Sequence, residues 1–309
     1  MDKKELTKTI KRLAYQYGFD RVGISCAQEL TEESVKLNQW LDAGMHGQMS
    51  YMKNHAGLRI NPEALLPGAK SVISLTHNYY NPSPTPENSF KIARYAYGKD
   101  YHNVLHKKLK KLTSDISHQF SEIKFRNCAD SAPIMEKAWA KRSGIGWQGK
   151  NGCIIAPKVG SFFFLATIIT DADLDYDTPL KDHCGTCQEC LDACPTGAIT
   201  SPYVVDARKC ISYLTTELKD KIPEEIKGKY RDWIFGCDIC QDVCPHNRFS
   251  KPHDEDRFMP KDKLLAMTEA EWRKLSEDEF SELFAGTPIK RIKYEGLKKN
   301  IAFVDKEKP

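Results

Sequence analysis

The sequence lacks a long hydrophobic run. Its longest one, FFFLATII at 162–169, has eight residues, whereas a helix that spans a membrane needs about twenty. We therefore interpret this run as a buried strand. The first residues, MDKKELTKTIKRLAYQYGFD, carry both charge signs among apolar residues at helical spacing and lack the apolar core of a signal peptide. These absences predict no membrane partner and a cytoplasmic location.

Neither charge sign is in large excess. The chain has 46 Lys and Arg residues and 42 Asp and Glu residues, which gives a net charge of +4. The excess lies at the C-terminal end, where residues 285–309 contain seven basic and three acidic side chains. A basic edge is typical of a surface that binds a polyanion, but a solvated helix face followed by a frayed tail is the more common explanation. The candidate contacts are Lys290, Arg291, Lys298 and Lys299.

Cysteine, in contrast, is abundant, with eleven residues. Without a secretory signal, this number indicates metal ligation rather than disulfides. The stretch CGTCQECLDACP at 184–195 has the CxxCxxCxxxCP spacing of two-cluster ferredoxins, in which the fourth cysteine ligates the other cluster. A second motif, GCDICQDVCP at 236–245, lacks a first cysteine, which Cys210 can supply.

The spacing therefore predicts two [4Fe-4S] clusters with crossed ligation. One is held by Cys184, Cys187, Cys190 and Cys244, and the other by Cys194, Cys210, Cys237 and Cys240. Two zinc sites are the structural alternative, but a zinc site needs neither a third close cysteine nor the reciprocal CxxxCP. The remaining cysteines, Cys26, Cys128 and Cys153, are interpreted from spacing alone as small buried hydrophobic residues.

Hydrophobic periodicity predicts strands and helices in alternation up to about residue 170. Strands are expected at 21–27 and 70–80, a helix at 101–120 and a second helix from Pro133 to Gly144. The stretches 151–157 and 160–170 are expected to form a hairpin. The match of GIGWQG at 144–149 to a dinucleotide-binding loop fails its context, because it follows a helix and precedes a strand; a glycine C-cap and loop is favoured.

Four stretches resemble the epoxyqueuosine reductase family over nearly the whole chain. They are GMHGQMSYM at 44–52, ARYAYGKDYH at 93–102, CADSAPIMEKAWAKRSGIGWQGKNG at 128–152 and the first cysteine run with its continuation PTGAI. The resemblance implies a fold of class α+β, in which a nitroreductase-like α/β domain that binds cobalamin is fused to a two-cluster ferredoxin domain, as in reductive dehalogenases. The expected divisions are 1–172 for the cobalamin domain, 173–250 for the ferredoxin domain and 251–309 for a helical, basic segment.

The resemblance also implies the reaction, the reduction of epoxyqueuosine to queuosine at the wobble position of tRNA. Two electrons pass through the clusters to cobalamin, and the departing oxygen takes a proton from Asp130 in the DSAP motif. A carboxylic acid that donates at neutral pH needs a raised pKa, which we expect from desolvation in the cofactor pocket. From spacing alone, Asp130 would instead be the N-cap of the helix that follows it.

Several residues are expected to contact cobalamin by the same resemblance. No DxHxxG motif is present, so base-off cobalamin without a histidine ligand is expected. The candidates are Gly57, Arg59, Tyr97, Asp130, Ser131, Cys153, Ile155, Lys158, Ser212 and Thr215. Each has an ordinary structural explanation: Tyr97 can simply pack, Lys158 lies in a turn, and Ser212 and Thr215 can cap a helix or face solvent.

Members of the family usually continue into a C-terminal helical-repeat domain that binds tRNA, whereas this chain ends at GLKKNIAFVDKEKP. The basic residues 290–299 are therefore the expected remainder of the tRNA surface. The other expected partner is a small redox protein that donates electrons, and a monomer is expected. The rival functions are a corrinoid reductase of the reductive dehalogenase type, whose members usually carry an export signal, and an electron-transfer module with clusters but no substrate of its own.

Overall fold

The computed structural model describes residues 2–82 and 88–305, and its main sheet joins segments that are far apart in the chain. The strand order is β1 (Arg21–Cys26), β2 (Ser71–Asn78), β7 (Phe163–Thr170) and β4 (Phe125–Cys128), and every neighbouring pair is antiparallel. Side chains on both faces of β2 and β7 are buried, so both faces of the sheet are covered. An antiparallel sheet with covering helices agrees with the predicted class α+β.

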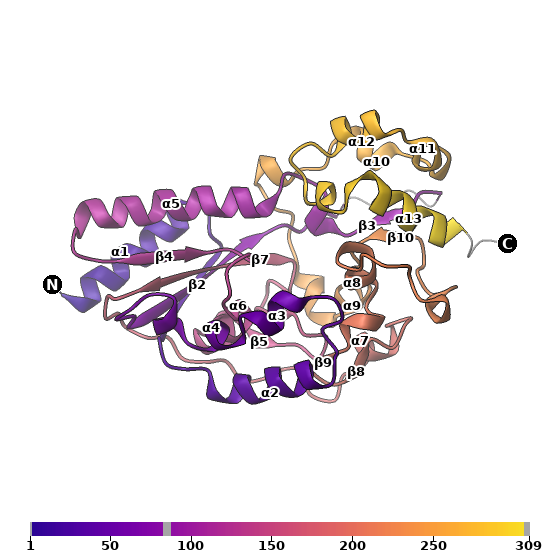
Figure 1. Ribbon diagram of the computed structural model, residues 1–309. Coiled ribbons are helices and arrows are strands. Elements are labelled where there is room, and N and C mark those ends of the chain that lie inside the picture. The colour runs from indigo at the N-terminus through magenta and orange to yellow at the C-terminus, as the bar shows by residue number, and fades with distance from the viewer. Residues whose placement is uncertain (1, 83–87, 306–309) are drawn as a thin grey trace.

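Two long helices cover one face of the sheet and lie side by side in Figure 1, α1 (Lys3–Gln16) and α5 (Tyr101–Gln119). Leu6 and Ile10 of α1 and Leu109 of α5 share one hydrophobic core with Ile73 and Ile168 of the sheet. Asp2 and Asp100 cap the two helices through their carboxylates. The helix predicted at 101–120 is confirmed, and Asp100 fixes where it begins.

The opposite face is covered by α6 (Glu136–Arg142), whose Trp139 packs on Val72 and Ile169. In Figure 1, the helices α3 (Ser50–Asn54) and α4 (Ala56–Ile60) lie on this side too, with α2 (Thr31–Asp42) beneath them. The helix predicted from Pro133 begins three residues later. Its predicted end is confirmed, because Gly144 takes a positive φ of 72° directly after the C-cap Ser143.

The predicted hairpin at 151–170 is wrong. β6 (Ile154–Ile155) pairs with β5 (Trp147–Gln148), and only the isolated bridge between Ala156 and Gly160 joins the two expected arms. The reason is that β7 already pairs with β2 on one edge and β4 on the other, so no edge is left for β6. The interpretation of GIGWQG as a C-cap and loop is confirmed, because it leads from α6 into β5.

A second hydrophobic core lies away from the sheet and joins residues 90–97, 207–235 and 264–304. Its elements and the short ones near the cysteines are β3 (Lys91–Ile92), α7 (Glu189–Asp192), β8 (Ile199–Ser201), β9 (Val204–Val205), α8 (Ile211–Thr216), β10 (Trp233–Phe235), α9 (Ile239–Asp242), α10 (Asp262–Ala266), α11 (Glu269–Lys274), α12 (Glu277–Leu283) and α13 (Lys293–Asp305). The fully buried Asn300 of α13 donates from Nδ2 to the carbonyls of Thr215 and Ile234, each at 2.9 Å. The C-terminal helices are thus part of the same packed body as the cysteine region.

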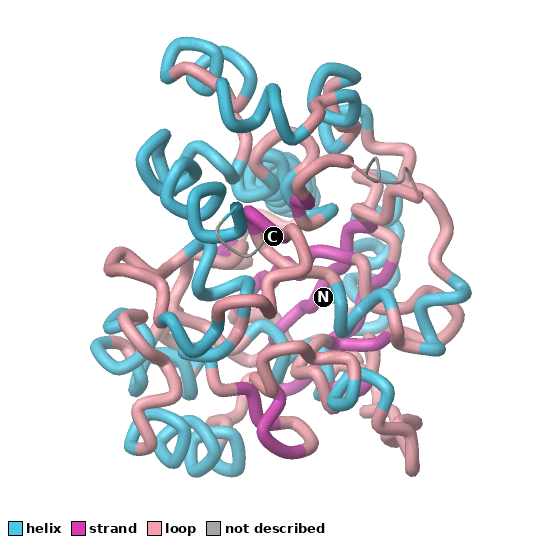
Figure 2. The backbone as a smooth tube through the Cα atoms, turned by 90° about the vertical axis from the view of Figure 1, so that its right-hand side faces the viewer, coloured by secondary structure: helices cyan, strands magenta, loops and turns pink. Residues whose placement is uncertain are grey.

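Figure 2 shows most strands in the interior, surrounded by helices and loops. Within residues 2–82 and 88–305, no helix has both the length and the apolar character needed to cross a bilayer.

Candidate active site and cluster cysteines

The first predicted set of four cysteines surrounds one cavity, although Cys244 comes from the second motif. The lining residues are Cys184, Cys187, Cys190, Cys244, Lys150, Asn151, Ile155, Glu189, Pro245 and His246. The Lys150 ammonium donates to the carbonyls of Gly185 at 2.7 Å and Cys187 at 2.9 Å and so fixes the loop between the cysteines. Folding brings together the set that the spacing predicts.

The second predicted set is also gathered. Desolvation raises the pKa of Cys240, and the charges of Cys153, Cys210, Cys237 and Cys194 raise it further. The pKa of Cys237 is raised by desolvation and by Cys210 and Cys194. No cysteine of the first set is among these named causes, which separates the two groups.

Both groups have the chemistry of thiolate sites that need a cation. Desolvation and then the neighbouring charges of Cys244 and Cys184 raise the pKa of Cys190 to about 11, so a bound iron atom would favour the thiolate at this sulfur. Backbone N–H groups already favour the thiolates, those of Tyr213 and Ser212 at Cys210 and that of Ile239 at Cys237.

Four thiols around a hollow match a cubane, in which each sulfur ligates its own iron atom. The first set, which lines a cavity, therefore fits a cluster, and the assignment of each thiol in both sets stays a prediction that the grouping supports.

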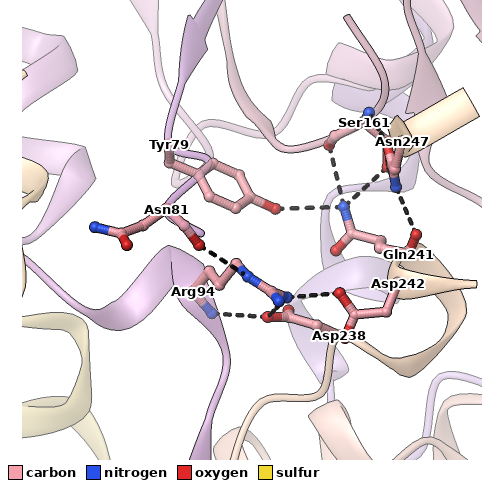
Figure 3. A network of polar contacts seen from close by, with 8 residues as sticks. All are labelled: Tyr79, Asn81, Arg94, Ser161, Asp238, Gln241, Asp242 and Asn247. Atoms are coloured by element: carbon pink, nitrogen blue, oxygen red, sulfur yellow. Dashed lines mark hydrogen bonds and ion pairs between the residues drawn. The ribbon is translucent and has the colours of Figure 1, made fainter. Parts of the chain in front are cut away.

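A buried polar network holds the second cysteine motif against the sheet domain (Figure 3). The Arg94 guanidinium donates to Asp238 at 3.1 Å and to Asp242 at 2.7 Å, and its Nε donates to the Asn81 carbonyl at 3.1 Å. On the other side of α9, Gln241 Nε2 donates to Ser161 Oγ at 3.0 Å. These contacts fix the loop that carries Cys237, Cys240 and Cys244.

Asn247 completes this network (Figure 3). Its Nδ2 donates to the Gln241 carbonyl at 2.6 Å, and its Oδ1 accepts from the Ser161 backbone N–H at 2.6 Å. Gly160 passes so close that a Cβ there would lie 2.2 Å from Asn247 Oδ1. The contact leaves no room for a larger residue at position 160.

Asp130 lies just beyond the end of β4, opposite the first turn of α5. Its carboxylate Oδ2 accepts from the Tyr101 hydroxyl at 2.6 Å and lies 2.9 Å from His102 Nε2. Its backbone has a φ of 58°, and its N–H donates to both carboxylate oxygens of Glu136 at 3.1 and 3.2 Å. Asp130 is not the N-cap of α6, which is Met135, so the capping alternative is wrong.

The expected rise in the pKa of Asp130 is also wrong for this structure. Desolvation does raise it, but the hydrogen bonds from His102 and Tyr101 and the charges of His102 and Arg291 outweigh that effect, so its pKa lies below the usual value. About half of the side chain, 51%, is open to solvent, and the donors on the other half stabilise the carboxylate. Asp130 is therefore ionised at neutral pH.

Four side chains around Asp130 had no role in the sequence interpretation: Asp100, Tyr101, His102 and Glu136. Desolvation and the charge of Asp130 raise the pKa of Glu136 to about 8 and keep the phenol of Tyr101 protonated. The signal that could have found them is the pair of polar ring side chains, Tyr101 and His102, directly after the N-cap of a long helix. Such residues lie at a helix end rather than along its buried face.

Two of the expected cobalamin contacts, Arg59 and Cys153, lie near Asp130 or near the second cysteine set. Desolvation lowers the pKa of Arg59, and this effect is partly opposed by the charges of Tyr51, Asp130 and Glu136. Arg59 Nε is buried without a hydrogen-bond partner. Gly57 of the same helix has no atom within 4 Å of the position a Cβ would take. Desolvation raises the pKa of Cys153, and the charge of Lys137, which follows Glu136 in the chain, opposes only part of this rise. The charge of Cys153 also acts on Cys240, so Cys153 lies near the second cysteine set.

The other expected contacts are more scattered. Ser131 follows Asp130, and Ser212 is half-buried at the start of α8. Thr215 is buried, accepts from the Gly236 N–H at 2.9 Å and donates to the Ile211 carbonyl at 2.7 Å. The remaining three lie elsewhere: Tyr97 in a pocket with Arg94 and Asp238, Ile155 at the first cysteine cavity, and Lys158 exposed in a turn with a φ of 59°.

The four basic candidates divide into two pairs. Lys298 donates to the Arg273 carbonyl at 2.5 Å, and Lys299 donates to the Leu218 carbonyl at 2.6 Å. Desolvation lowers the pKa of Lys299. Lys290 and Arg291 are exposed, and the charge of Arg291 acts on Asp130. The second pair therefore presents its charge to solvent, with Arg291 near Asp130, while the first pair ties α13 to the rest of the chain.

Two family models match parts of the chain. One, described as 4Fe-4S double cluster binding domain, matches residues 183–247, which contain both cysteine sets. The other, described as epoxyqueuosine reductase QueG, matches residues 59–131, from Arg59 to just past Asp130.

Solved structures give the same fold. An epoxyqueuosine reductase crystallised with an epoxyqueuosine-modified tRNA stem loop superposes with a TM-score of 0.88 at 29% identity, over 97% of this chain and 80% of that one. The reductive dehalogenase NpRdhA shares the fold alone, with a TM-score of 0.51 at 17% identity over 99% of this chain and 37% of that one.

Curated relatives cover nearly the entire sequence. The epoxyqueuosine reductase of Cellulophaga algicola is 51% identical over 98% of this chain and 99% of its own length, and that of Leadbetterella byssophila is 52% identical over 97% and 99%. The one from Escherichia coli is 41% identical over 98% of this chain and 81% of its own length, so relatives differ in length at this similarity. On this evidence the chain belongs to the epoxyqueuosine reductase family.

Proposed function

We propose that this chain reduces epoxyqueuosine to queuosine at the wobble position of tRNA. The observation that carries the proposal is identity of 51% and 52%, over nearly the full length, to proteins named epoxyqueuosine reductase. The geometry supports it, because a half-exposed carboxylate with two hydrogen-bond donors, Asp130, belongs to the same body as two sets of four thiols.

The reaction converts an epoxide to an alkene and takes up two electrons and two protons, with release of water. Iron–sulfur clusters carry single electrons, so two of them can deliver what one turnover needs. The proposed ligands are Cys184, Cys187, Cys190 and Cys244 for one cluster and Cys194, Cys210, Cys237 and Cys240 for the other. Cys153 lies close enough to the second set for its charge to act on Cys240, so we propose that the electrons leave from that cluster.

Cobalamin is the proposed acceptor of these electrons. When bound, it supplies a low-valent cobalt centre that can break a carbon–oxygen bond, chemistry that amino-acid side chains lack. The unpartnered Arg59 Nε and the open backbone at Gly57 fit a large ligand with polar edges. Ser131 and Cys153 are proposed to complete the contacts, in a domain of nitroreductase-like type with base-off cobalamin and no histidine ligand.

Asp130 is the proposed group that protonates the departing oxygen. Tyr101 and His102 orient its carboxylate, and Glu136 fixes its backbone N–H. About half of the side chain is exposed, so one carboxylate oxygen is available to the substrate while Oδ2 is held. The exposed basic side chains of Lys290 and Arg291 would attract the tRNA phosphates, and the charge of Arg291 acts on Asp130.

A small redox protein is the proposed electron donor to the cysteine region, and we expect a monomer in the cytoplasm, where tRNA is modified. The solved relative bound to a modified stem loop supports an anticodon stem loop as the minimal substrate.

The experiment compares substrates with the anaerobically reconstituted chain and dithionite. We expect conversion of an epoxyqueuosine-containing anticodon stem loop to the queuosine form and no release of halide from a halogenated phenol. Dehalogenation without epoxide reduction would support the reductive dehalogenase alternative. Loading of both clusters without cobalamin binding or turnover would favour an electron-transfer module.

A further inference from the structure

We propose that Asp130 relays a proton that is stored on His102, which the fold holds between two carboxylates, Asp100 and Asp130. The proposal rests on the proposed function, because the proton is needed for the oxygen that leaves the epoxide. His102 acts through Asp130 and is a positioning and proton-supplying residue that does not itself touch the substrate.

The hydrogen bonds of His102 define its protonation state. Its Nδ1 lies 2.6 Å from Asp100 Oδ1, and its Nε2 lies 2.9 Å from Asp130 Oδ2. A neutral imidazole has only one N–H donor, so it could satisfy only one of these two carboxylates. The imidazolium satisfies both, and the geometry therefore selects the cation.

The ring is also held rigidly. It stacks on Tyr101 with ring centres 4.1 Å apart, and Tyr101 in turn stacks on Phe164 of β7 at 4.2 Å with an angle of 5°. Asp100 is fixed as the N-cap of α5, where its Oδ1 also accepts from the His102 backbone N–H at 3.1 Å. The first turn of α5, which packs on the sheet, therefore fixes the relative positions of Asp100, His102 and Asp130.

The surrounding charges agree with this geometry. Desolvation lowers the pKa of His102, but the hydrogen bonds and charges of Asp100 and Asp130 raise it to about 9. Glu136 also faces this line, and its carboxyl feels the His102 charge. The phenols of Tyr101, Tyr95 and Tyr51 are protonated, and Glu217 feels the charge of Asp130. Two cations complete the set: Arg59, on which Asp130 acts, and Arg291, which acts on both Asp100 and Asp130. Near neutral pH, the mobile proton is on His102 and Asp130 is ionised.

The transfer balances as follows. His102 Nε2–H first passes its proton to the ionised Asp130, and the carboxylic acid so formed then gives that proton to the oxygen as its bond to carbon breaks, which returns Asp130 to the carboxylate. The neutral imidazole keeps Nδ1–H bonded to Asp100, and a proton from the solvent restores the imidazolium. Two such transfers, with two electrons from the proposed clusters, convert the epoxide to an alkene and water.

The first test measures the pKa of His102 directly and does not depend on turnover. Nitrogen-15 NMR of the cluster-loaded, oxidised, cobalamin-free chain follows the imidazoles with pH, and His102→Gln identifies the resonance. We expect His102 to titrate near pH 9 and Asp100→Asn to bring that value down toward the ordinary one, about 6.5. Titration of wild-type His102 at or below the ordinary value would overturn the proposal.

The second test is the pH profile of epoxide reduction by the loaded enzyme. Asn still caps a helix, so Asp100→Asn should fold. A fall in the His102 pKa from about 9 toward about 6.5 predicts a loss of about tenfold or more at pH 8 and little loss at pH 6. His118→Gln, an exposed histidine near the other end of α5, should keep the wild-type profile.

Parallel profiles of Asp100→Asn and wild type would overturn the relay, as would full activity of His102→Gln at every pH. Failure of the proposed function would look different: the wild-type chain would not convert the stem loop at any pH, and the NMR titration would still decide the state of His102.

Discussion

Asp130 adopts a backbone conformation that few residues other than glycine adopt, with a φ of 58°. Such a residue persists where its surroundings hold it in place, and here three side chains do so: Glu136 at the backbone N–H, and Tyr101 and His102 at the carboxylate. In this position Oδ2 is held while about half of the side chain stays exposed. We infer that this orientation, rather than a raised pKa, is what the residue contributes.

At this position, Asp130→Asn is expected to keep both clusters and cobalamin bound while epoxide reduction falls by about a hundredfold or more, the usual contribution of a positioned acid. The amide can still accept from Tyr101, so the loop should stay in place, but it cannot carry the proton. The measurement is the turnover rate together with iron content and a cobalamin titration. Asp42→Asn, at an exposed carboxylate that ends α2, is the matched control, and full activity of Asp130→Asn would contradict the role of the carboxylate.

Residue spacing was informative for the cysteines and less so for the acid site. The cysteine motifs predict their own partners, because three thiols within one loop leave the fourth to the other motif. For Asp130, the decisive neighbours Tyr101 and His102 come from a helix start that only the packed sheet brings opposite β4. The sequence therefore predicted desolvation but not the two donors that reverse its effect on the pKa.

At the scale of elements, α9 is a short helix whose position depends on buried polar contacts rather than on its own length (Figure 3). Asn247→Ala would leave the Ser161 N–H and the Gln241 carbonyl without their partner. We expect a loss of roughly 2 to 4 kcal/mol in the free energy of unfolding, measured by urea denaturation, and weaker retention of iron. Asn38→Ala, at an exposed site in α2, should change stability little; an equal effect of both substitutions would show that the network does not hold the motif.

The elements themselves were largely predictable. Apolar spacing located α5 and the strands β1, β2 and β7, because each buries a continuous face against a large core. The hairpin failed because local sequence does not reveal which strand edges are already paired. The segments near Asp130 and at residue 160 depend on backbone conformations and close contacts that periodicity does not encode.

At the scale of the molecule, some C-terminal lysines stabilise the packing of the chain and others are free to bind a polyanion. Lys299→Gln should cost stability, since its ammonium binds the Leu218 carbonyl, and should leave the salt dependence of stem-loop binding unchanged. Lys290→Gln, at an exposed site, should reduce the slope of log affinity against log salt by about one and leave stability unchanged. Binding at several salt concentrations with thermal unfolding of each variant checks both statements; the opposite ranking would remove the proposed tRNA surface.

The two cysteine sets and Asp130 belong to one folded body, in which the charge of Cys153 acts on Cys240 of the second set. This arrangement is the physical basis of the central claim, that electrons from two clusters reach an epoxide whose oxygen is protonated through Asp130. The full-length relatives place the chain in the family, and the claim concerns how its own residues carry out the reaction.

The most direct test is a single turnover. The loaded chain is reduced, freed of excess reductant, mixed anaerobically with the epoxyqueuosine stem loop and frozen at successive times for EPR and product analysis. The account predicts that the signals of the reduced clusters disappear in step with the appearance of queuosine. Clusters that stay reduced while product forms, or that are oxidised while the epoxide remains intact, would contradict it.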